Sequence, residues 1–400
     1  MQHLLDEKWI EIDVDAIKQN LESINALVDE RVRLIAVVKA DAYGHGAANI
    51  ARILYQNGVD FFAVTFLHEA MVLRKAGIRS SVMVFSPLIE QEQVKQAIDN
   101  HFTLTVSSLY DSQLIDEVSR HLKQAVTVHL KLDTGLGRFG LKPEELSEIC
   151  QSLKENPHIY IEGIYTHMAE AASSDASFTE KQFDLFMTTV SNLEKNGYKI
   201  PVKHCANSAV FLKYPHMHLD AVRIGTLLSG QFPAGEFSQR LDLLDPFKFK
   251  SRIISLKTLE AGSSLGYYRT YRLKEKAQIA VIPVGFNDGL ALEVNNKATG
   301  LLDLLKILAK KILAYWNSPR FNIYVNIKGS SCCPIRGKVF MQMSMAEIPP
   351  DLDVEIGDEV ELPVRKTLAS KNLLRLYMKE GEAVKVESED LTAYMVEKED

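Results

Sequence analysis

Residues 34–46 read "LIAVVKADAYGHG", an apolar run that ends at Lys39 and leads directly into a turn containing Asp41, Tyr43 and two glycines. A short run of β-branched residues bounded by turn signals is typical of a buried strand. A lysine at a strand end most often marks only the point where the chain reaches solvent. The alternative is that Lys39 is held partly buried in a site, and the rest of the sequence decides between the two.

Runs of the same kind recur through the first 225 residues, and helical patterns fill the gaps between them. The helical patterns have the expected punctuation, such as Gly58 after one helix and Pro143 at the start of another. Eight strand-helix units in about 200 residues predict an α/β fold, a parallel (β/α)₈ TIM barrel over residues 1–242, with an open doubly wound sheet as the alternative. The expected strands are 34–38, 61–65, 82–85, 102–106, 126–132, 159–166, 202–206 and 220–224.

From about residue 243 the pattern changes to alternating runs such as "FKFKSRIISLKTL" and "FNIYVNIKG", which predict a mostly antiparallel β domain over 243–400. The stretch "TGLLDLLKILAKKILAYW" at 299–316 interrupts this domain, with apolar residues at helical spacing opposite Lys306, Lys310 and Lys311. We expect a helix that covers one face of the β domain; a subunit contact or a lid is the alternative.

The composition excludes several classes of protein. The chain has 400 residues, a formal net charge of -6 and no block of clustered Lys and Arg, so nucleic acid is not an expected partner. It lacks an apolar run long enough to span a membrane or to form a signal peptide, so we expect a cytoplasmic protein without a membrane partner. Its four cysteines lack zinc-type spacing, which predicts reduced thiols and no metal site.

The unusual residues of the barrel segment fall where catalytic groups of such barrels lie, at the carboxyl ends of the strands. A partly buried lysine near other cations becomes a neutral nucleophile suited to a Schiff base. The backbone amides of Gly225 and Thr226, in the turn that follows Arg223 and Ile224, could hold a phosphate. The residues in question are Lys39, Asp133 to Arg138, His167, Asn207, Ser208, Arg223, Gly225 and Thr226.

Seven motifs occur in a fixed order along the chain: "VVKADAYGHG", "LKLDTGLGRFG", "GIYTHMA", "HCANSA", "VRIGTLLSG", "GSSLGYYRTY" and "PVGFNDG". By these motifs the chain resembles the alanine racemase family, barrel-type enzymes that depend on pyridoxal 5'-phosphate (PLP). The resemblance covers most of the length and is strongest from 9 to 230.

The resemblance implies a role for each matching residue. Lys39 would carry the cofactor and act as one catalytic base, and Tyr267 would be the second base, presented across the interface of a homodimer. Arg138 and Met341 would contact the amino acid substrate, and Lys131 corresponds to a lysine that is carbamylated in many members. The remaining cofactor contacts would come from Tyr43, Arg138, His167, Asn207, Ser208, Arg223, Gly225, Thr226 and Tyr377.

Racemisation explains why two bases are needed. The cofactor acidifies the Cα proton, after which one group must accept a proton on one face and another must donate it on the opposite face. Arg223 would face the ring nitrogen and remain charged, so it cannot protonate that nitrogen. This arrangement favours prompt return of a proton over transamination.

Three residues depart from the family pattern, all in the second domain. Phe286 stands where a tyrosine is usual, Gln342 where an aspartate follows Met341, and Tyr268 where a glycine follows the second base. These changes concern the substrate entrance, so the substrate is left open. The leading hypothesis is alanine racemisation; the alternatives are racemisation of another, larger amino acid, a PLP-binding protein with vestigial catalysis, and a decarboxylase on a similar barrel.

Overall fold

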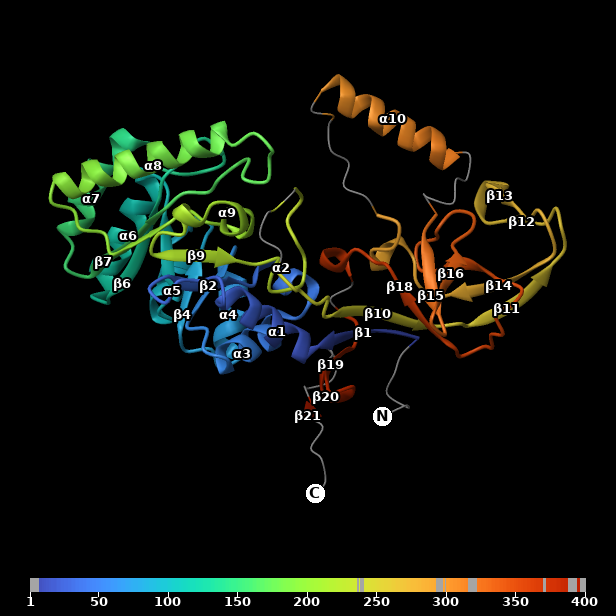
Figure 1. Ribbon diagram of the computed structural model, residues 1–400. Coiled ribbons are helices and arrows are strands. Elements are labelled where there is room, and N and C mark those ends of the chain that lie inside the picture. Colours follow the sequence, from blue (N-terminus) through green and yellow to red (C-terminus); the bar gives the residue numbers. More distant parts are fainter. Residues whose placement is uncertain are drawn as a thin grey trace. The chain divides into compact units, whose positions relative to one another are not determined.

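The computed structural model describes residues 7–235, 237, 241–292, 298, 300–315, 322–369, 372–387 and 394–395. The chain divides into two compact units, Val14–Pro246 and a second unit that combines Met1–Asp13 with Phe247–Asp400. Figure 1 shows both units in colours that follow the sequence. Among the described residues, no helix is both long enough and apolar enough to cross a membrane.

The unit Val14–Pro246 is built on eight parallel strands in residues 33–224, every one of which is described. Their order is β8-β7-β6-β5-β4-β3-β2-β9, and the isolated bridge between Ala206 and Val222 joins the last strand to the first. The predicted (β/α)₈ barrel is confirmed. The strands are Arg33–Val37 (β2), Phe61–Val64 (β3), Ser81–Val84 (β4), Thr103–Val106 (β5), Val126–Lys131 (β6), Ile159–Tyr165 (β7), Val202–His204 (β8) and Ala221–Ile224 (β9).

Helices follow most of these strands and lie outside the sheet (Figure 1). They are Val14–Asn25 (α1), Lys39–Gly44 (α2), Ala47–Gln56 (α3), Leu67–Lys75 (α4), Gln91–Asp99 (α5), Leu109–Leu122 (α6), Leu146–Lys154 (α7), Ser177–Lys195 (α8) and Ser208–Lys213 (α9). After β9 the chain makes a turn at 226–230 and forms no further helix in the described part of this unit.

The barrel core explains the continuous apolar runs of the sequence. Strands β3 and β5 are buried at every position, because one face meets the barrel interior and the other the surrounding helices. Ile35, Phe61 and Met83 pack together on one side of the core with 0% exposure. Thr105 is a polar residue of this core with a partner, because its hydroxyl donates to the Val84 carbonyl at 2.8 Å.

The second unit contains a mixed sheet in the order β16-β15-β18-β10-β1-β19-β20-β21. Its pairs are antiparallel except for β1 with β19, in agreement with a mostly antiparallel β domain. Strand β1 comes from the first residues of the chain, and the alternation of 8–13 had not been recognised as a strand. The strands are Lys8–Asp13 (β1), Phe247–Arg252 (β10), Tyr324–Ile327 (β15), Ser330–Pro334 (β16), Glu359–Leu362 (β18), Arg375–Lys379 (β19), Glu382–Glu387 (β20) and Tyr394–Met395 (β21).

Two smaller sheets, one α-helix and short 3₁₀ helices complete the described part of this unit. The sheets are β11-β14-β17 and the hairpin β12-β13. The helix α10, Leu301–Tyr315, lies inside the stretch 299–316 that the sequence predicts to be helical. The strands are Ser255–Leu259 (β11), Ser264–Leu265 (β12), Tyr271–Arg272 (β13), Ala277–Ile282 (β14) and Ser344–Ile348 (β17).

Candidate active site

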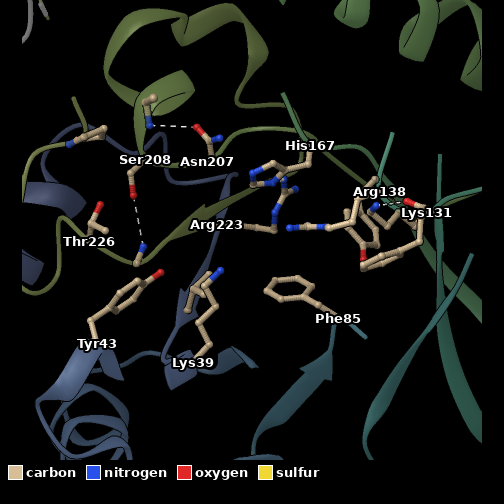
Figure 2. A pocket seen from close by; sticks show the side chains of 16 residues that line it. Lys39, Tyr43, Phe85, Lys131, Arg138, His167, Asn207, Ser208, Arg223 and Thr226 are labelled. Atoms are coloured by element: carbon tan, nitrogen blue, oxygen red, sulfur yellow. Dashed lines mark hydrogen bonds between the residues drawn. The ribbon is translucent and has the colours of Figure 1, made fainter. Parts of the chain in front are cut away.

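A cavity of about 260 Å³ opens at the carboxyl ends of the barrel strands (Figure 2). It brings together every candidate residue of the barrel unit to which the resemblance gave a role: Lys39, Tyr43, Lys131, Arg138, His167, Asn207, Ser208, Arg223, Gly225 and Thr226. These residues are up to 187 positions apart in the sequence, between Lys39 and Thr226, and only closure of the barrel makes them neighbours.

Lys39 follows β2 and its side chain points into the cavity, with Tyr43 on one side and Phe85 on the other (Figure 2). The backbone behind it is unusual, because the four residues 40–43 all have φ between 50° and 57°. Left-handed turns of non-glycine residues cost about 1–2 kcal/mol per residue, so the surrounding contacts must hold this turn in place.

Two carboxylates hold the left-handed turn. Asp41 accepts a hydrogen bond from the Ala47 amide at 2.8 Å, which fixes the start of α3. Glu69 of α4 accepts from the Ala40 amide at 2.6 Å with one oxygen and from the Thr65 and Phe66 amides with the other. Glu69 thereby ties the turn after β2 to the turn after β3, and the position of Lys39 depends on it.

The environment of Lys39 disfavours its charged form. Burial lowers the pKa of the Lys39 ammonium, and the positive charge of Arg138 lowers it further, while Glu69 acts in the opposite direction. A lysine with a lowered pKa supplies the neutral amine that nucleophilic attack requires. The structure therefore supports the interpretation that Lys39 is held partly buried in a site, and not the more common one that it only marks where the strand reaches solvent.

Gly225, Tyr43 and Ser208 form a narrow cradle at one end of the cavity. The Gly225 amide donates to the Ser208 hydroxyl at 3.4 Å. A Cβ atom at position 225 would lie 2.9 Å from Cζ of Tyr43 and closer still to its hydroxyl, so only glycine fits. A hydroxyl from α2, a hydroxyl from α9 and a backbone amide after β9 thus converge in a space of the kind that binds a phosphate.

Two other residues singled out from the sequence have mainly structural contacts. The Asn207 side chain accepts hydrogen bonds from the Ala209 and Val210 amides at 3.0 Å, which makes it the N-cap of α9. The Asp133 carboxylate accepts from the amides of 135, 136 and 137, and so it shapes the loop that carries Arg138.

Arg223 is 4% exposed and its guanidinium is held by groups of β7 and β8 and the residues that follow them. It donates to the carbonyls of Thr166 at 2.8 Å and Cys205 at 3.2 Å, and to Nδ1 of His204 at 2.8 Å. A guanidinium fixed in this way stays protonated and cannot rotate, so it presents a constant charge to the cavity.

A chain of hydrogen bonds runs from Arg223 through the barrel interior. His204 Nε2 lies 2.9 Å from Nδ1 of His129, and His129 Nε2 lies 2.9 Å from the Glu162 carboxylate. Because Arg223 can only donate and the carboxylate can only accept, both imidazoles are neutral and protonated on Nε2. Burial lowers the pKa of both histidines, in agreement with that assignment.

The cavity carries a strong excess of positive charge. Lys39, Lys131, Arg138 and Arg223 line it, and the lining, which is described throughout, contains no aspartate or glutamate. Burial, followed by these four cations, lowers the pKa of His167 to about 3, so its imidazole is neutral. Burial and Arg138 lower the pKa of Lys131 to about 8, and its ammonium donates to the Phe139 carbonyl. The cavity is therefore suited to an anionic ligand.

The predicted second base and the substrate entrance lie in the other unit and do not line this cavity. Tyr267 is 67% exposed in a 3₁₀ turn, and its ring packs edge-on against Phe340 with centroids 5.1 Å apart. The Phe286 amide donates to the Phe340 carbonyl at 3.0 Å, and the next residue reaches the carbonyl of Met341. Residues 267, 286, 340 and 341 thus form one surface, which we call the Tyr267 cluster.

Tyr377 and Tyr268 have different environments. Tyr377 is 1% exposed in β19, and its hydroxyl donates to Glu387 at 2.9 Å, so its role as a phosphate ligand stays a prediction. Tyr268 is 86% exposed with φ of 60°, and the Lys338 ammonium lies 4.5 Å from the centre of its ring. Glycine adopts this left-handed backbone more readily than tyrosine does.

Sequence reasoning missed several residues that support the site. Phe85 and Tyr165 line the cavity as ordinary apolar strand residues would, and nothing in the sequence distinguishes them. His129 and His204 do leave a signal, because a histidine inside a buried strand needs a partner. Glu69 lies in the first turn of α4, where an acidic residue is common and attracts no notice in the sequence. Only the fold shows that its carboxylate also accepts a hydrogen bond from Ala40 in the turn after Lys39.

The fold and the cavity together define a (β/α)₈ barrel in which a strand-end lysine of lowered pKa lies in a cationic cavity. A family model described as the alanine racemase N-terminal domain matches residues 12–233, and one described as the C-terminal domain matches residues 247–373. This chain therefore belongs to the alanine racemase family.

Individual relatives agree with the family match. The chain is 35% identical over 353 residues to alanine racemase 1 of Caldanaerobacter subterraneus, which covers 88% of this chain and 84% of the relative. It is 33% identical over 354 residues to alanine racemase of Methanococcus maripaludis, which covers 88% and 87%. Among solved structures, alanine racemase of Clostridium difficile 630 is similar with a TM-score of 0.84 and 30% identity over 96% of this chain and 99% of that one.

Proposed function

We propose that this protein is a PLP-dependent racemase that interconverts L-alanine and D-alanine. The observation that supports this proposal best is the cavity at the carboxyl ends of the barrel strands, where Lys39 lies among three further cations. The relatives that match over most of the chain are alanine racemases, which favours alanine over the larger substrates that the altered entrance had left open.

The residues present fit this cofactor. Four cations without a carboxylate in the described lining suit a phosphate and a substrate carboxylate together. The cradle of Tyr43, Ser208 and the Gly225 amide has room for phosphate oxygens only because residue 225 has no side chain. We infer that this cradle and Thr226 hold the phosphate, that Lys39 forms the covalent link, and that Arg223 lies at the ring nitrogen. When bound, PLP takes up the electron pair left when the Cα proton departs.

The chain's own residues supply the proton transfers and the orientation. Lys39, with its lowered pKa, accepts the proton on one face of Cα and returns one there in the reverse direction. Tyr267 serves the opposite face, and Arg138 binds the substrate carboxylate. Met341, in the Tyr267 cluster, contacts the substrate. His167, neutral because of burial and the nearby cations, lies against the cofactor without adding a charge.

Arg223 has the task of keeping the ring nitrogen unprotonated. Its charge is fixed, and His204 accepts a hydrogen bond from Nη1 of Arg223 without taking the proton, while His204 is itself bonded to His129. With PLP bound, this fixed cation would leave the ring nitrogen unprotonated, so the ring would supply a weaker electron sink and return of the proton to Cα would be favoured. This device suits racemisation and disfavours transamination.

The proposal includes a homodimer in the cytoplasm. Tyr267 is largely exposed and belongs to a different unit from Lys39, which agrees with presentation of the Tyr267 cluster to the barrel of a second copy. The buried free thiols Cys150, Cys205 and Cys333 agree with a reducing compartment.

The decisive experiment is exchange of the Cα proton in heavy water by the purified protein loaded with PLP. L-alanine and D-alanine are supplied separately beside a panel of larger amino acids, and the chirality of the product is read. We expect exchange with racemisation, strongest for alanine. Faster turnover of a larger amino acid would shift the substrate assignment to the altered entrance, and loss of the carboxylate would identify a decarboxylase.

A further inference from the structure

The helix α10 carries an apolar face that no described part of the chain covers. Leu301, Leu305, Leu308 and Ile312 are 73%, 53%, 49% and 53% exposed. At 100° per residue these four side chains lie within about 60° of one another on the helix. Leu304 and Leu313, 43% and 42% exposed, widen the face on its two sides. An exposed apolar surface of this extent marks a site of interaction.

The unit from which α10 arises does not account for this face. Ile307 is the least exposed residue of the helix whose side chain is described, and it lies about 160° around the helix from Leu305 and about 100° from Leu308. The expectation that the helix covers one face of the β domain with its leucines is therefore not met in the described residues. No residue that the structure describes covers these leucines.

The charges around the face identify the kind of partner. Lys306 and Lys311 lie at the two margins of the apolar face, and Lys310 lies behind it; all three are exposed. The helix has three lysines and one aspartate, whereas the whole chain has a net charge of -6. A membrane that contains acidic lipids has an apolar acyl layer under anionic headgroups. An apolar helix face bordered on both sides by lysines is complementary to such a surface, because the leucines can enter the acyl layer while the ammonium groups stay at the headgroups.

A second copy of the helix fits less well. Leu301, Leu305, Leu308 and Ile312 have the spacing of a coiled-coil seam, but 15 residues supply only about two heptads. Lys311 would lie beside that seam, where a second copy offers no carboxylate because the single acidic residue of the helix, Asp303, lies on another side. The helix has 15 residues, fewer than the roughly 20 needed to cross a bilayer, so it would lie along the surface.

We propose that α10 docks on an anionic lipid surface, with its leucines in the acyl boundary and its lysines at the headgroups. This places the racemase at a membrane as a peripheral protein, although the composition had suggested no membrane partner. None of the described side chains of α10 lines the cavity or belongs to the Tyr267 cluster, so we expect the contact to leave the basal racemase activity unchanged.

The test is vesicle flotation with the full-length holoenzyme. Vesicles of phosphatidylcholine with about one third phosphatidylglycerol are compared with pure phosphatidylcholine, and we expect binding to the former that salt weakens. Leu308→Glu and the triple change of Lys306, Lys310 and Lys311 to Gln should each reduce binding by at least about tenfold. The triple change to Arg should retain it.

A matched control excludes a general effect of a new surface charge. Leu109 of α6 is 48% exposed, against 49% for Leu308, so Leu109→Glu should bind vesicles like the wild type. Tryptophan fluorescence gives a second readout, because Trp9 is buried and Trp316, the only other tryptophan, follows α10 in the sequence. Equal binding to neutral vesicles would overturn the anionic preference. Failure of the wild type to bind vesicles would overturn the proposal. If Leu308→Glu then also changed the oligomeric state, the face would be a contact between copies of the chain.

Discussion

The close approach of Tyr43 to Gly225 makes Gly225→Ala the sharpest test of the phosphate cradle. The backbone at Gly225 is not left-handed, so alanine meets no conformational strain there. Its Cβ would lie 2.9 Å and 3.0 Å from two ring carbons of a Tyr43 side chain that cannot move freely, because burial holds it, as the rise of its pKa to about 12 also reflects. The substitution therefore forces the two strand-end turns apart.

The expected magnitude follows from two opposing effects. Overpacking of this kind lowers the free energy of unfolding by about 1–3 kcal/mol. Replacing glycine by alanine raises it by about 0.4–1 kcal/mol, because alanine reduces the conformational entropy of the unfolded chain. The net loss of about 1–2 kcal/mol should lower the unfolding midpoint of the barrel by about 2–8 °C. The affinity for PLP should fall by about tenfold or more, because the phosphate loses its position.

Two controls make the result specific. Gly300 also has a backbone outside the left-handed region and open space around its Cα, so Gly300→Ala should change stability by less than about 0.5 kcal/mol. Tyr43→Phe removes the atom nearest to the new methyl group, so Gly225→Ala should cost at most about half as much in that background. Thermal unfolding of the apoprotein and PLP titration measure both effects. An equal loss in the two backgrounds, or a loss no larger than that of Gly300→Ala, would refute the reasoning.

The remaining predictions concern single side chains. In Lys39→Ala, borohydride reduction after addition of PLP should leave no cofactor on any lysine peptide by mass spectrometry; a persistent adduct elsewhere would contradict the assignment. The pKa of His167 is lowered to about 3 in the folded protein, so on acidification the unfolded chain binds a proton at this residue first. Acidification from pH 6.5 to 5 should therefore lower the free energy of unfolding by about 2 kcal/mol through His167. In denaturant titrations, His167→Asn should make the free energy of unfolding less dependent on pH over this range. Glu69→Gln should destabilise the barrel by about 1–3 kcal/mol, whereas Gln at the exposed Glu148 should not. Glu162→Leu should release His129 from its Nε2–H tautomer, and imidazole nitrogen shifts in NMR that match the wild type would argue against the chain of hydrogen bonds.

Most of the barrel could be predicted because its evidence is local. Each strand is an apolar run and each helix has its own period and punctuation, so the order of elements follows from short windows of sequence. Strand β1 was missed for the opposite reason. Its partners Phe247–Arg252 and Arg375–Lys379 lie more than 230 residues away, and no local pattern reveals such a pairing.

The candidate site likewise has features that the sequence predicts and features that only the fold reveals. The sequence by itself determined the residue types and their order: a lysine and a tyrosine in one turn, an arginine after a glycine-rich loop, and a glycine after the last strand. Tertiary structure alone decided that these groups share one cavity without a carboxylate in its described lining, that Glu69 holds the turn of Lys39, and that two buried histidines connect Arg223 to Glu162. The physical reason is that charge, burial and hydrogen-bond direction depend on which groups meet in space, and that meeting is set by closure of the barrel.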